Sequence, residues 1–293
     1  MGYLEAIISG IIQGLTEFLP VSSSGHLSLF QYFTGNSGEE AAVFSVVLHL
    51  GTLIAVIIAF WPVIARLIVE FFKMVGDMCR GRFIYSQKTP YQNMIFMLII
   101  SLLPLGITFI FKDWMQGIAS DNDIIGEGIC FIVTGVLLFL STSLVQGGRK
   151  ARHMRPKDAL LIGLMQAIAP LPGISRSGST LSVAMMLGFN KKYALDFSFI
   201  MGIPAVMGAI LLDVKDIFSE SFSIPVPVLL VGLVVSLIFG ILAVAMVRWL
   251  VATDKLRWFS YYTLVLGIIV TALGIYEHFT GNLIQSFITA HLG

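Results

Sequence analysis

The chain carries one short polar motif twice, and each copy interrupts an otherwise apolar stretch. The copies read IQGLTEFLPVSSSGH at residues 12–26 and MQAIAPLPGISRSGS at residues 165–179. An offset of 153 residues aligns them without a gap, and it places Gln166 on Gln13, Ser175 on Ser22, Ser177 on Ser24 and Gly178 on Gly25. The same offset also places Phe197-Ser198 on Phe44-Ser45. A constant offset over this distance indicates a duplicated unit.

The two copies differ at three positions that matter chemically. Glu17 aligns with Pro170, Ser23 with Arg176, and His26 with Ser179. One copy therefore holds an acid and an imidazole, and the other copy holds a cation. If the copies face each other, we expect them to assemble a single site from both halves.

The composition of the chain indicates whether it folds in water or in a membrane. Hydrophobic residues make up 57% of it and charged residues only 12%, with a mean hydropathy of +0.90. These values are typical of an integral membrane protein. The net charge of +1 gives no indication of a nucleic-acid partner. The N-terminus lacks the basic segment and cleavage pattern of a signal peptide, so we expect its apolar start to belong to the mature protein.

Six apolar stretches are about as long as the roughly 20 residues that a membrane-spanning helix needs. They lie at residues 43–61, 94–111, 125–145, 194–212, 227–249 and 259–277. The two motif regions, 4–34 and 158–189, are instead broken in the middle by Pro, Gly and Ser. Broken backbone at membrane depth survives only where protein or a water-filled cavity satisfies it. We therefore predict two re-entrant helix hairpins.

The charges of the loops predict orientation. The segments 62–93, 146–158 and 250–258 are rich in Lys and Arg, whereas 112–124, 213–226 and the C-terminal tail are not. Basic loops remain in the cytoplasm. We therefore expect both termini and the opening of the active site on the outer side of a bacterial inner membrane.

The number of spans then predicts an inverted repeat. Each repeat contains one hairpin and three spans, and three is odd, so the second copy enters the membrane from the opposite face. The predicted fold is an all-α polytopic membrane protein with six transmembrane helices and two re-entrant hairpins. It forms a single membrane domain over residues 1–293, with repeats at about 1–145 and 158–280. The hairpin tips at 20–26 and 172–180 should meet at the membrane midplane.

Glu17 and Arg176 are the strongest candidates for chemistry. An intramembrane carboxylate is costly and by default indicates function, although a Glu can also reach the interface or bond to a serine. Glu17 follows Gln13 by four residues, so both lie on one helix face. A buried guanidinium needs an anion and matches a carboxylate or a phosphate. The alternative for Arg176 is a structural ion pair with Glu17 that ties the repeats together.

The serine-rich tips form a second candidate group. Hydroxyls and free N–H groups at a helix start favour an anion, whereas ordinary N-capping is the simpler interpretation. The residues concerned are Ser22, Ser23, Ser24 and Gly25 in one copy and Ser175, Ser177, Gly178, Ser179 and Thr180 in the other.

Of the five histidines, one is a candidate for chemistry and three are interpreted as structural. His26 lies on the polar tip and is a candidate nucleophile or acid–base group. It is also the nearest base in sequence for Ser23. We interpret His49, His278 and His291 as interior residues without a catalytic role. There is no Cys/His metal cluster, but Glu17 and phosphate oxygens together are suited to Ca²⁺ or Mg²⁺.

These residues resemble a known family, the undecaprenyl-pyrophosphate phosphatases, also called bacitracin-resistance proteins. The resemblance rests on Gln13, Glu17 and PVSSSGH at 20–26, on PGISRSGST at 172–180, and on SFIMGIP at 198–204. It extends over nearly the whole chain. Gln13 stands where many members have Glu, which removes one carboxylate from a possible metal site.

The resemblance implies that the protein dephosphorylates a polyprenyl diphosphate, undecaprenyl diphosphate, at the outer face of the membrane. It implies dependence on Ca²⁺ or Mg²⁺, with Glu17 binding the metal or transferring a proton. It also implies attack by Ser23 or His26, and a diphosphate clamp made by Arg176, Ser175, Ser177 and Thr180. Bacitracin is expected to compete for the substrate rather than bind the protein. A homodimer remains an open possibility.

Two other functions were weighed against this one. A lipid-carrier or solute transporter could use the same anion site, since inverted repeats with broken hairpins are common among transporters. A type-2 phosphatidic-acid phosphatase requires a His and an Asp at a fixed spacing after its Ser-Arg. Here the next His after Arg176 is His278, so the sequence argues against that class.

Overall fold

The computed structural model describes residues 2–35, 39–111, 115, 123–144, 147–219 and 224–292. Within these residues the chain is helical, and the one β-type pairing is an isolated bridge between Arg149 and Phe189. The helices of the first half are α1 (Tyr3–Phe18), α2 (Ser23–Thr34), α3 (Glu39–Cys79), α4 (Pro90–Leu102), α5 (Leu105–Ile110) and α7 (Ile125–Leu144). Those of the second half are α8 (Pro156–Ile168), α9 (Arg176–Met186), α10 (Lys191–Ser219), α11 (Val226–Ala252), α12 (Arg257–Thr280) and α13 (Leu283–Leu292). Short 3₁₀ turns at Tyr85–Gln87 and Ala151–His153 complete the list.

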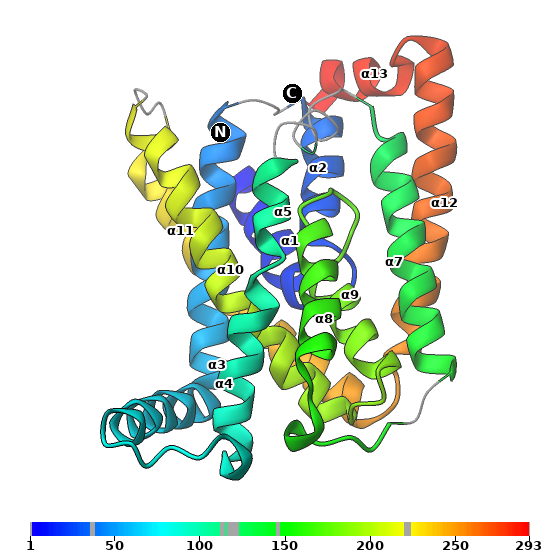
Figure 1. Cartoon of the computed structure of the whole chain (residues 1–293). Helices are drawn as coiled ribbons and strands as arrows, with labels where there is room; N and C mark the ends of the chain where they lie inside the picture. The colour runs from blue at the N-terminus through cyan, green and yellow to red at the C-terminus, as the bar shows by residue number, and fades with distance from the viewer. Residues whose placement is uncertain are drawn as a thin grey trace.

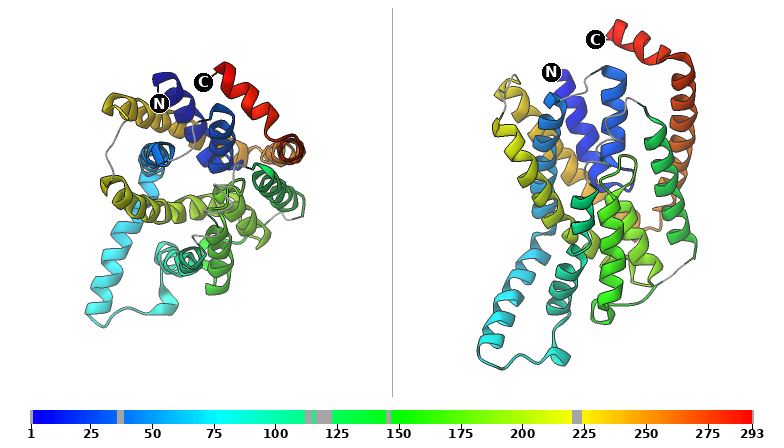
Figure 2. Two further views of the ribbon diagram at one scale, coloured as in Figure 1. Left: turned by 90° about the horizontal axis from the view of Figure 1, so that it is seen from above. Right: turned by 45° about the horizontal axis from the view of Figure 1, so that its top comes forward.

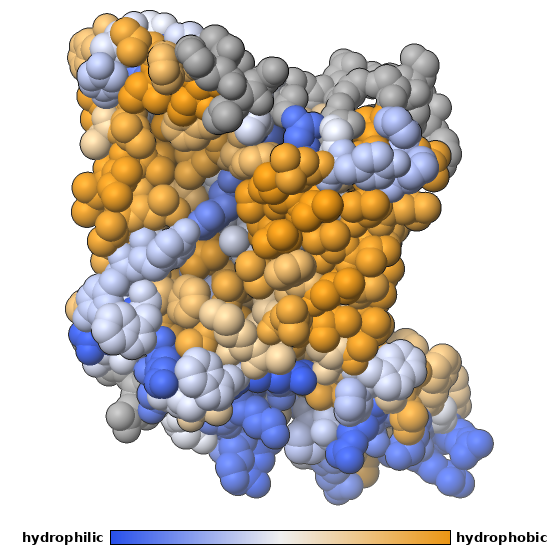
Figure 3. Space-filling view, turned by 180° about the vertical axis from the view of Figure 1, so that it is seen from behind, coloured by the Kyte–Doolittle hydropathy of each residue, from blue (hydrophilic) through white to orange (hydrophobic). Residues whose placement is uncertain are grey.

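Six segments of the described chain are long and apolar enough to cross a membrane. They are Val43–Cys79, Pro90–Thr108, Ile125–Ser143, Lys191–Leu212, Val226–Ala252 and Arg257–Thr280. Each contains most or all of one predicted stretch, so the prediction of six spans is confirmed. The surface agrees with it, because a broad apolar band crosses the face seen in Figure 3 and hydrophilic residues gather at its lower edge.

Helix α3 corrects the prediction of a loop at 62–93. The helix continues through Pro62 and ends only at Cys79, and its last part projects away from the bundle (Figure 2). The charged residues that suggested a loop, among them Arg66 and Lys73, recur at helical spacing beside the buried Leu67 and Met74. An amphipathic helix has this pattern.

Two further elements depart from the predicted pattern. The stretch 94–111 is not one continuous helix, because α4 ends at Leu102 and α5 begins after Pro104. Proline lacks the N–H that would continue the helix ladder. The C-terminal tail contains a helix, α13, which the sequence analysis did not predict.

Both motif regions fold as pairs of short helices joined by a turn. Helices α1 and α2 meet at residues 19–22, and α8 and α9 at residues 169–175. Both turns lie inside the bundle rather than at its ends (Figure 1). The longest of these four helices has 16 residues, or about 24 Å at 1.5 Å per residue. None of them alone is long enough to cross a hydrocarbon core of about 30 Å.

The packing of the bundle brings these pairs against helices from the other half of the chain. Helix α1 packs on α11, α8 packs on α4, α3 packs on α10 and α11, and α7 packs on α12. An aromatic core lies directly below the first turn, where the Phe18 ring stacks on Phe199 at 5.7 Å and Phe60 approaches Phe199 at 5.4 Å. Three helices, α1, α3 and α10, are thereby fixed around the place where the two turns meet.

Candidate active site

The two motif turns are in direct contact. The Gly173 N–H donates to Ser22 Oγ at 3.1 Å, and Ser177 Oγ donates to the Leu19 carbonyl at 3.3 Å. A Cβ atom at Gly25 would lie 2.7 Å from the nitrogen of Gly173, so only glycine permits this approach. The prediction that the tips meet is confirmed.

The two copies of the motif also share their local structure. Ser22 caps α2 by accepting from the Gly25 N–H at 3.3 Å, and Ser175 caps α9 by accepting from the Gly178 N–H at 3.0 Å. In each copy the capping hydroxyl also lies 3.3 Å from the hydroxyl of the serine two residues later, which is Ser24 in the first copy and Ser177 in the second. These bonds show that Ser22 and Ser175 act as N-caps, which was the simpler interpretation of both residues.

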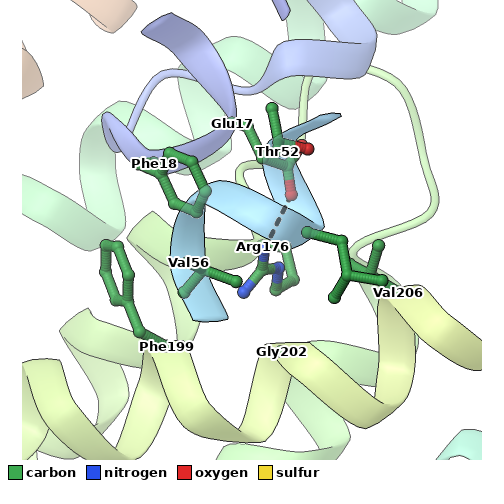
Figure 4. A pocket seen from close by; sticks show the side chains of 9 residues that line it. Glu17, Phe18, Thr52, Val56, Arg176, Phe199, Gly202 and Val206 are labelled. Atoms are coloured by element: carbon green, nitrogen blue, oxygen red, sulfur yellow. Dashed lines mark hydrogen bonds and ion pairs between the residues drawn. The ribbon is translucent and has the colours of Figure 1, made fainter. Parts of the chain in front are cut away.

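Glu17 is the centre of the polar cluster between the turns. It lies in the last turn of α1 and is buried. Arg176 Nη2 donates to its Oε1 at 2.7 Å, while Ser23 Oγ at 2.7 Å and Gln13 Nε2 at 3.0 Å donate to its Oε2. The Glu17–Arg176 ion pair thus forms, and it joins the two copies of the motif (Figure 4). The same contacts bring Ser23 and Gln13 to the pair.

A small pocket lies beside the ion pair. Its polar residues are Glu17, Arg176 and Thr52, and the others are Phe18, Leu53, Val56, Phe199, Gly202 and Val206 (Figure 4). The space open to the centre of a water molecule is about 10 Å³, which corresponds to about one water. A Cβ at Gly202 would overlap the guanidinium of Arg176, so the glycine makes room for it. In such an apolar setting charges interact more strongly than in water.

His26 does not join this cluster through any hydrogen bond within the described residues. Its Nδ1 lies 2.7 Å from the carbonyl of Ser22, one turn earlier in the same helix, and its Nε2 lies 2.7 Å from the hydroxyl of Tyr262. No hydrogen bond joins His26 to Ser23 within the described residues, so a role of His26 as the base stays a prediction. The hydroxyl of Ser23 is bonded to Glu17 instead.

His49 lies closer to the cluster than the sequence analysis expected. Its Nδ1 is 2.8 Å from the carbonyl of Ser45, as expected for a satisfied interior residue, but its Nε2 is 3.9 Å from Glu17 Oε2. The 153-residue offset aligns Phe44-Ser45 with Phe197-Ser198, and this match was the sequence signal that this part of α3 lies close to the site. His278 is exposed rather than interior and lies 3.9 Å from Asp123, and the side chain of His291 lies outside the described residues.

Two threonines hold the second turn in place. Thr134 on α7 accepts from the Ser175 N–H at 3.0 Å and donates to the Gly173 carbonyl at 2.9 Å. Thr180 donates to the carbonyl of Arg176 and forms a very short contact with the hydroxyl of Ser198. Sequence reasoning missed Thr134, because a threonine on an apolar helix usually bonds within its own helix.

The described residues contain no group of three or more His, Cys, Asp or Glu that could hold a metal ion. One atom beside Glu17 is nevertheless available to a cation. The amide oxygen Oε1 of Gln13 is buried and has no hydrogen-bond partner in the described part of the chain.

A bundle with six helices long and apolar enough to cross a membrane, and with a buried acid and a partly buried serine and arginine where two inner turns meet, defines a polytopic membrane protein with a polar site inside its bundle. The sequence matches the bacitracin resistance protein family, BacA, over residues 6–269. The chain belongs to this family.

Its relatives carry a consistent name. It is 37% identical over 272 residues to an undecaprenyl-diphosphatase of Alkaliphilus metalliredigens, which covers 92% of this chain and 98% of the relative. It is 38% identical over 274 residues to one of Methanobrevibacter smithii, covering 92% and 97%. It is 37% identical over 273 residues to one of Bacteroides fragilis, with the same coverage.

Proposed function

We propose that this protein hydrolyses undecaprenyl diphosphate to undecaprenyl phosphate and inorganic phosphate. The observation that carries the proposal is the cluster of the buried Glu17 with the partly buried Ser23 and Arg176, which combines an acid, a hydroxyl and a fixed positive charge. Phosphoryl transfer needs mainly positioning and neutralisation of the phosphate oxygens. The names of the relatives support the choice of substrate.

Ser23 is the attacking group in this mechanism. Its Oγ forms a bond to the terminal phosphorus, its proton passes to Glu17, and the bond from phosphorus to the bridging oxygen breaks, so that undecaprenyl phosphate leaves. The 2.7 Å bond between Ser23 and Glu17 supports this assignment, because a nucleophilic hydroxyl needs an adjacent base. Both ring nitrogens of His26 have other partners, which disfavours the imidazole as nucleophile.

Water completes the reaction in a second step. The water oxygen attacks the phosphorus of the phosphoserine, and the bond between phosphorus and Oγ breaks. Oγ takes its proton back from Glu17, and both hydrogens of the water leave with the inorganic phosphate.

Arg176 binds the negative charge throughout both steps. In the described part of the chain only its Nη2 has a hydrogen-bond partner, Glu17. The remaining N–H donors of the guanidinium are suited to phosphate oxygens. The serines at the starts of α2 and α9 add hydroxyls and helix N-termini to the same region.

A divalent cation, Ca²⁺ or Mg²⁺, fits beside this cluster. The protein oxygens that would hold it are the carboxylate of Glu17 and the orphan amide oxygen of Gln13, with phosphate oxygens as further ligands, since hard cations prefer oxygen. It would neutralise charge on the phosphates. The prenyl chain stays in the lipid, so only the head group enters the protein.

The same proposal includes an inverted repeat with two re-entrant hairpins. The lengths of α1, α2, α8 and α9 support it, and so does the pairing of helices. When the helices of the two halves are matched in chain order, α1 corresponds to α8 and α4 to α11, so α1 on α11 and α8 on α4 are equivalent contacts. The end of α3, the start of α8 and the end of α11 lie at one end of the bundle, away from both termini (Figure 1). The exposed Arg80, Lys150 and Lys255 lie in the connections next to these helix ends. By the positive-inside rule the termini and the opening of the site face outward across the bacterial inner membrane.

Phosphate release by the purified protein in detergent tests the function. With Ca²⁺ or Mg²⁺ and undecaprenyl diphosphate, the wild type should release inorganic phosphate and Arg176→Ala should release almost none. A transporter requires two compartments and would release none in either form. A wild type without activity under these conditions would overturn the proposal.

The nucleophile is tested separately by trapping the phosphoenzyme. Rapid acid quenching followed by mass spectrometry should find acid-stable phosphate on Ser23. Phosphate on His26 would be acid-labile and would reverse the assignment.

A further inference from the structure

Helix α3 is longer than a membrane span requires. Its apolar segment Val43–Cys79 has 37 residues, or about 55 Å at 1.5 Å per residue, whereas a hydrocarbon core is about 30 Å thick. The end of the helix extends beyond the outline of the bundle when the molecule is seen from above (Figure 2). The last part of α3 therefore does not cross the membrane together with the bundle.

Helix α3 bends as it leaves the bundle (Figure 1), and Pro62 inside the helix supplies the physical reason. A proline removes a hydrogen bond from the preceding turn, and its ring pushes the helix to bend away from the proline side. Arg248 on α11 holds this preceding turn. Its Nη2 donates to the Ala59 carbonyl at 2.7 Å, and its Cζ lies 4.3 Å from the centroid of the Phe60 ring.

After Pro62 the helix has one charged face. Charged residues recur at intervals of four, three and four residues, at Arg66, Glu70, Lys73 and Asp77. With 3.6 residues per turn, these four residues and Pro62 lie within about 80° of the circumference. Because the helix bends away from the proline side, the charged face lies on the outside of the bend.

The exposed surface opposite the charged face is apolar. Ile68, Phe72 and Val75 are all exposed, and Phe72 is 68% exposed. Above the bend the same line of the helix carries the exposed Ile58 and Trp61, at intervals that fit the helical period. The apolar face of the end is therefore continuous with the exposed apolar surface of the spanning part.

Exposed tryptophans mark the membrane interface near the bend. Trp61 directly precedes Pro62, and Trp249 follows Arg248, which contacts the turn before Pro62. Both indole side chains are more than half exposed. Tryptophan is enriched where the hydrocarbon core meets the lipid headgroups. Helix α3 thus bends at a depth where an amphipathic helix is able to lie in the plane of the membrane.

The charge of this region is complementary to an anionic surface. Residues 66–88 contain five cations and two acids. Lys73 pairs with Glu70 at 3.2 Å, whereas the exposed Arg80 and Arg82 form no ion pair within the described residues. Amphipathic helices with basic residues beside them bind anionic lipid headgroups.

We propose that the end of α3, residues 63–79, is an interfacial helix that binds the anionic phospholipid surface of the leaflet at this end of the bundle. Its apolar face lies among the upper acyl carbons and its charged face lies among the headgroups. Arg80 and Arg82 bind lipid phosphates. This role goes beyond the proposed function and does not depend on it.

Lipid quenching of a fluorophore tests where the helix lies. In a full-length background without Cys79 and Cys130, bimane is attached at Phe72→Cys or Val75→Cys, with Lys73→Cys and Asp77→Cys as matched controls on the charged face. The protein is reconstituted into vesicles of phosphatidylcholine and phosphatidylglycerol that carry a nitroxide near the start of the acyl chain. The labels at 72 and 75 should be quenched at least about 2-fold more than those at 73 and 77.

The preference for anionic lipid is tested with the label at Phe72→Cys. In phosphatidylcholine vesicles, nitroxide-labelled phosphatidylglycerol should quench this label more strongly than the same amount of nitroxide-labelled phosphatidylcholine, because the cations gather anionic headgroups. Arg80→Gln combined with Arg82→Gln should abolish the difference. The matched control, Lys255→Gln with Arg257→Gln, removes the same charge between α11 and α12 and should preserve it.

Thermal unfolding in detergent identifies variants that fold, and Ile68→Cys replaces either apolar position if its variant does not. Equal quenching at apolar and charged positions would overturn the interfacial helix. A crosslink between two copies at Phe72→Cys, without quenching by lipid, would overturn it as well and assign the apolar face to a second copy of the chain. Equal quenching by the two nitroxide lipids before the arginines are replaced would overturn the binding of anionic headgroups.

Discussion

Ser23 and Arg176 occupy equivalent positions of the two motif copies, and their surroundings differ in a complementary way. The long Arg176 extends over Gly202, where a side chain would overlap the guanidinium. The offset of 153 places Gly202 on His49, and there the short Ser23 shares Glu17 with a histidine 3.9 Å from the carboxylate. The first copy has the small Ser23 and the large His49, and the second copy has the large Arg176 and the small Gly202 at the aligned positions. The space around Glu17 therefore receives one large side chain from each copy.

The ion pair of Glu17 and Arg176 should be strongly coupled in unfolding experiments. Removing one charge leaves the other buried and unpaired, so Glu17→Gln and Arg176→Met should each destabilise the protein by about 3–5 kcal/mol. The double variant should be more stable than the sum of the two losses predicts. Thermal unfolding of all four proteins in one detergent measures this. Strictly additive losses would show that the pair does not act as a unit.

Sequence reasoning anticipated the residues of the cluster and the Glu17–Arg176 ion pair, but not every contact that these residues make. Glu17, Ser23 and Arg176 were identified because they differ between aligned copies, and the duplicated tips meet as expected. His26 is the nearest candidate base to Ser23 in sequence, whereas the turn at 19–22 brings Glu17 into hydrogen-bond contact with the Ser23 hydroxyl. Tyr262 could not be found, because no local pattern relates it to a histidine 236 residues away.

At the scale of elements, the contact of the two turns depends on a glycine in the first turn of α2. A Cβ at Gly25 would lie 2.6 Å from the Phe131 ring and 2.7 Å from the Gly173 nitrogen. These distances are too short for real contacts, so α2 and the turn at 169–175 would have to separate. The contact of the tips therefore has no room for even one methyl group.

Gly25→Ala should consequently lower both stability and turnover. Overpacking of this kind costs about 1–3 kcal/mol, and separation of the turns should displace Arg176 from Glu17. Gly76→Ala on α3 is the matched control, because a Cβ there meets nothing within 4 Å and Ala is favoured over Gly in a helix by about 1 kcal/mol. Thermal unfolding and phosphate release should separate the two variants. Equal behaviour would contradict the tight contact.

Helix boundaries were harder to predict than helix positions. The apolar stretches predicted all six spans, since bilayer thickness requires a minimum length. The end of α3 was missed because clustered charges suggest a loop, although Arg66, Glu70, Lys73 and Asp77 recur at helical spacing. The break between α4 and α5 at Pro104 follows from the missing N–H of proline. The mean hydropathy of the stretch does not reveal this break.

At the scale of the whole molecule, the two ends of the bundle should face different compartments. Cys79 at the end of α3 is exposed, and Thr280 at the end of α12 is exposed at the opposite end (Figure 1). In a Cys130→Ser background, a membrane-impermeant maleimide added to intact cells should label Thr280→Cys. It should reach Cys79 only after the cells are permeabilised. Labelling of Cys79 in intact cells would reverse the orientation.

The contact between Glu17 and Arg176 also has a consequence for direction. In the inverted arrangement that we propose, two identical halves carrying both residues would form two such pairs, related by symmetry and opening toward opposite leaflets. Pro170 and Ser23 stand where the second pair would need its acid and its arginine. In that arrangement the divergence of the halves removes one of two equivalent sites, so the proposed reaction would take place on a single side of the bilayer. The residue differences that assemble the Glu17–Arg176 cluster would thereby also give the proposed reaction its direction across the membrane.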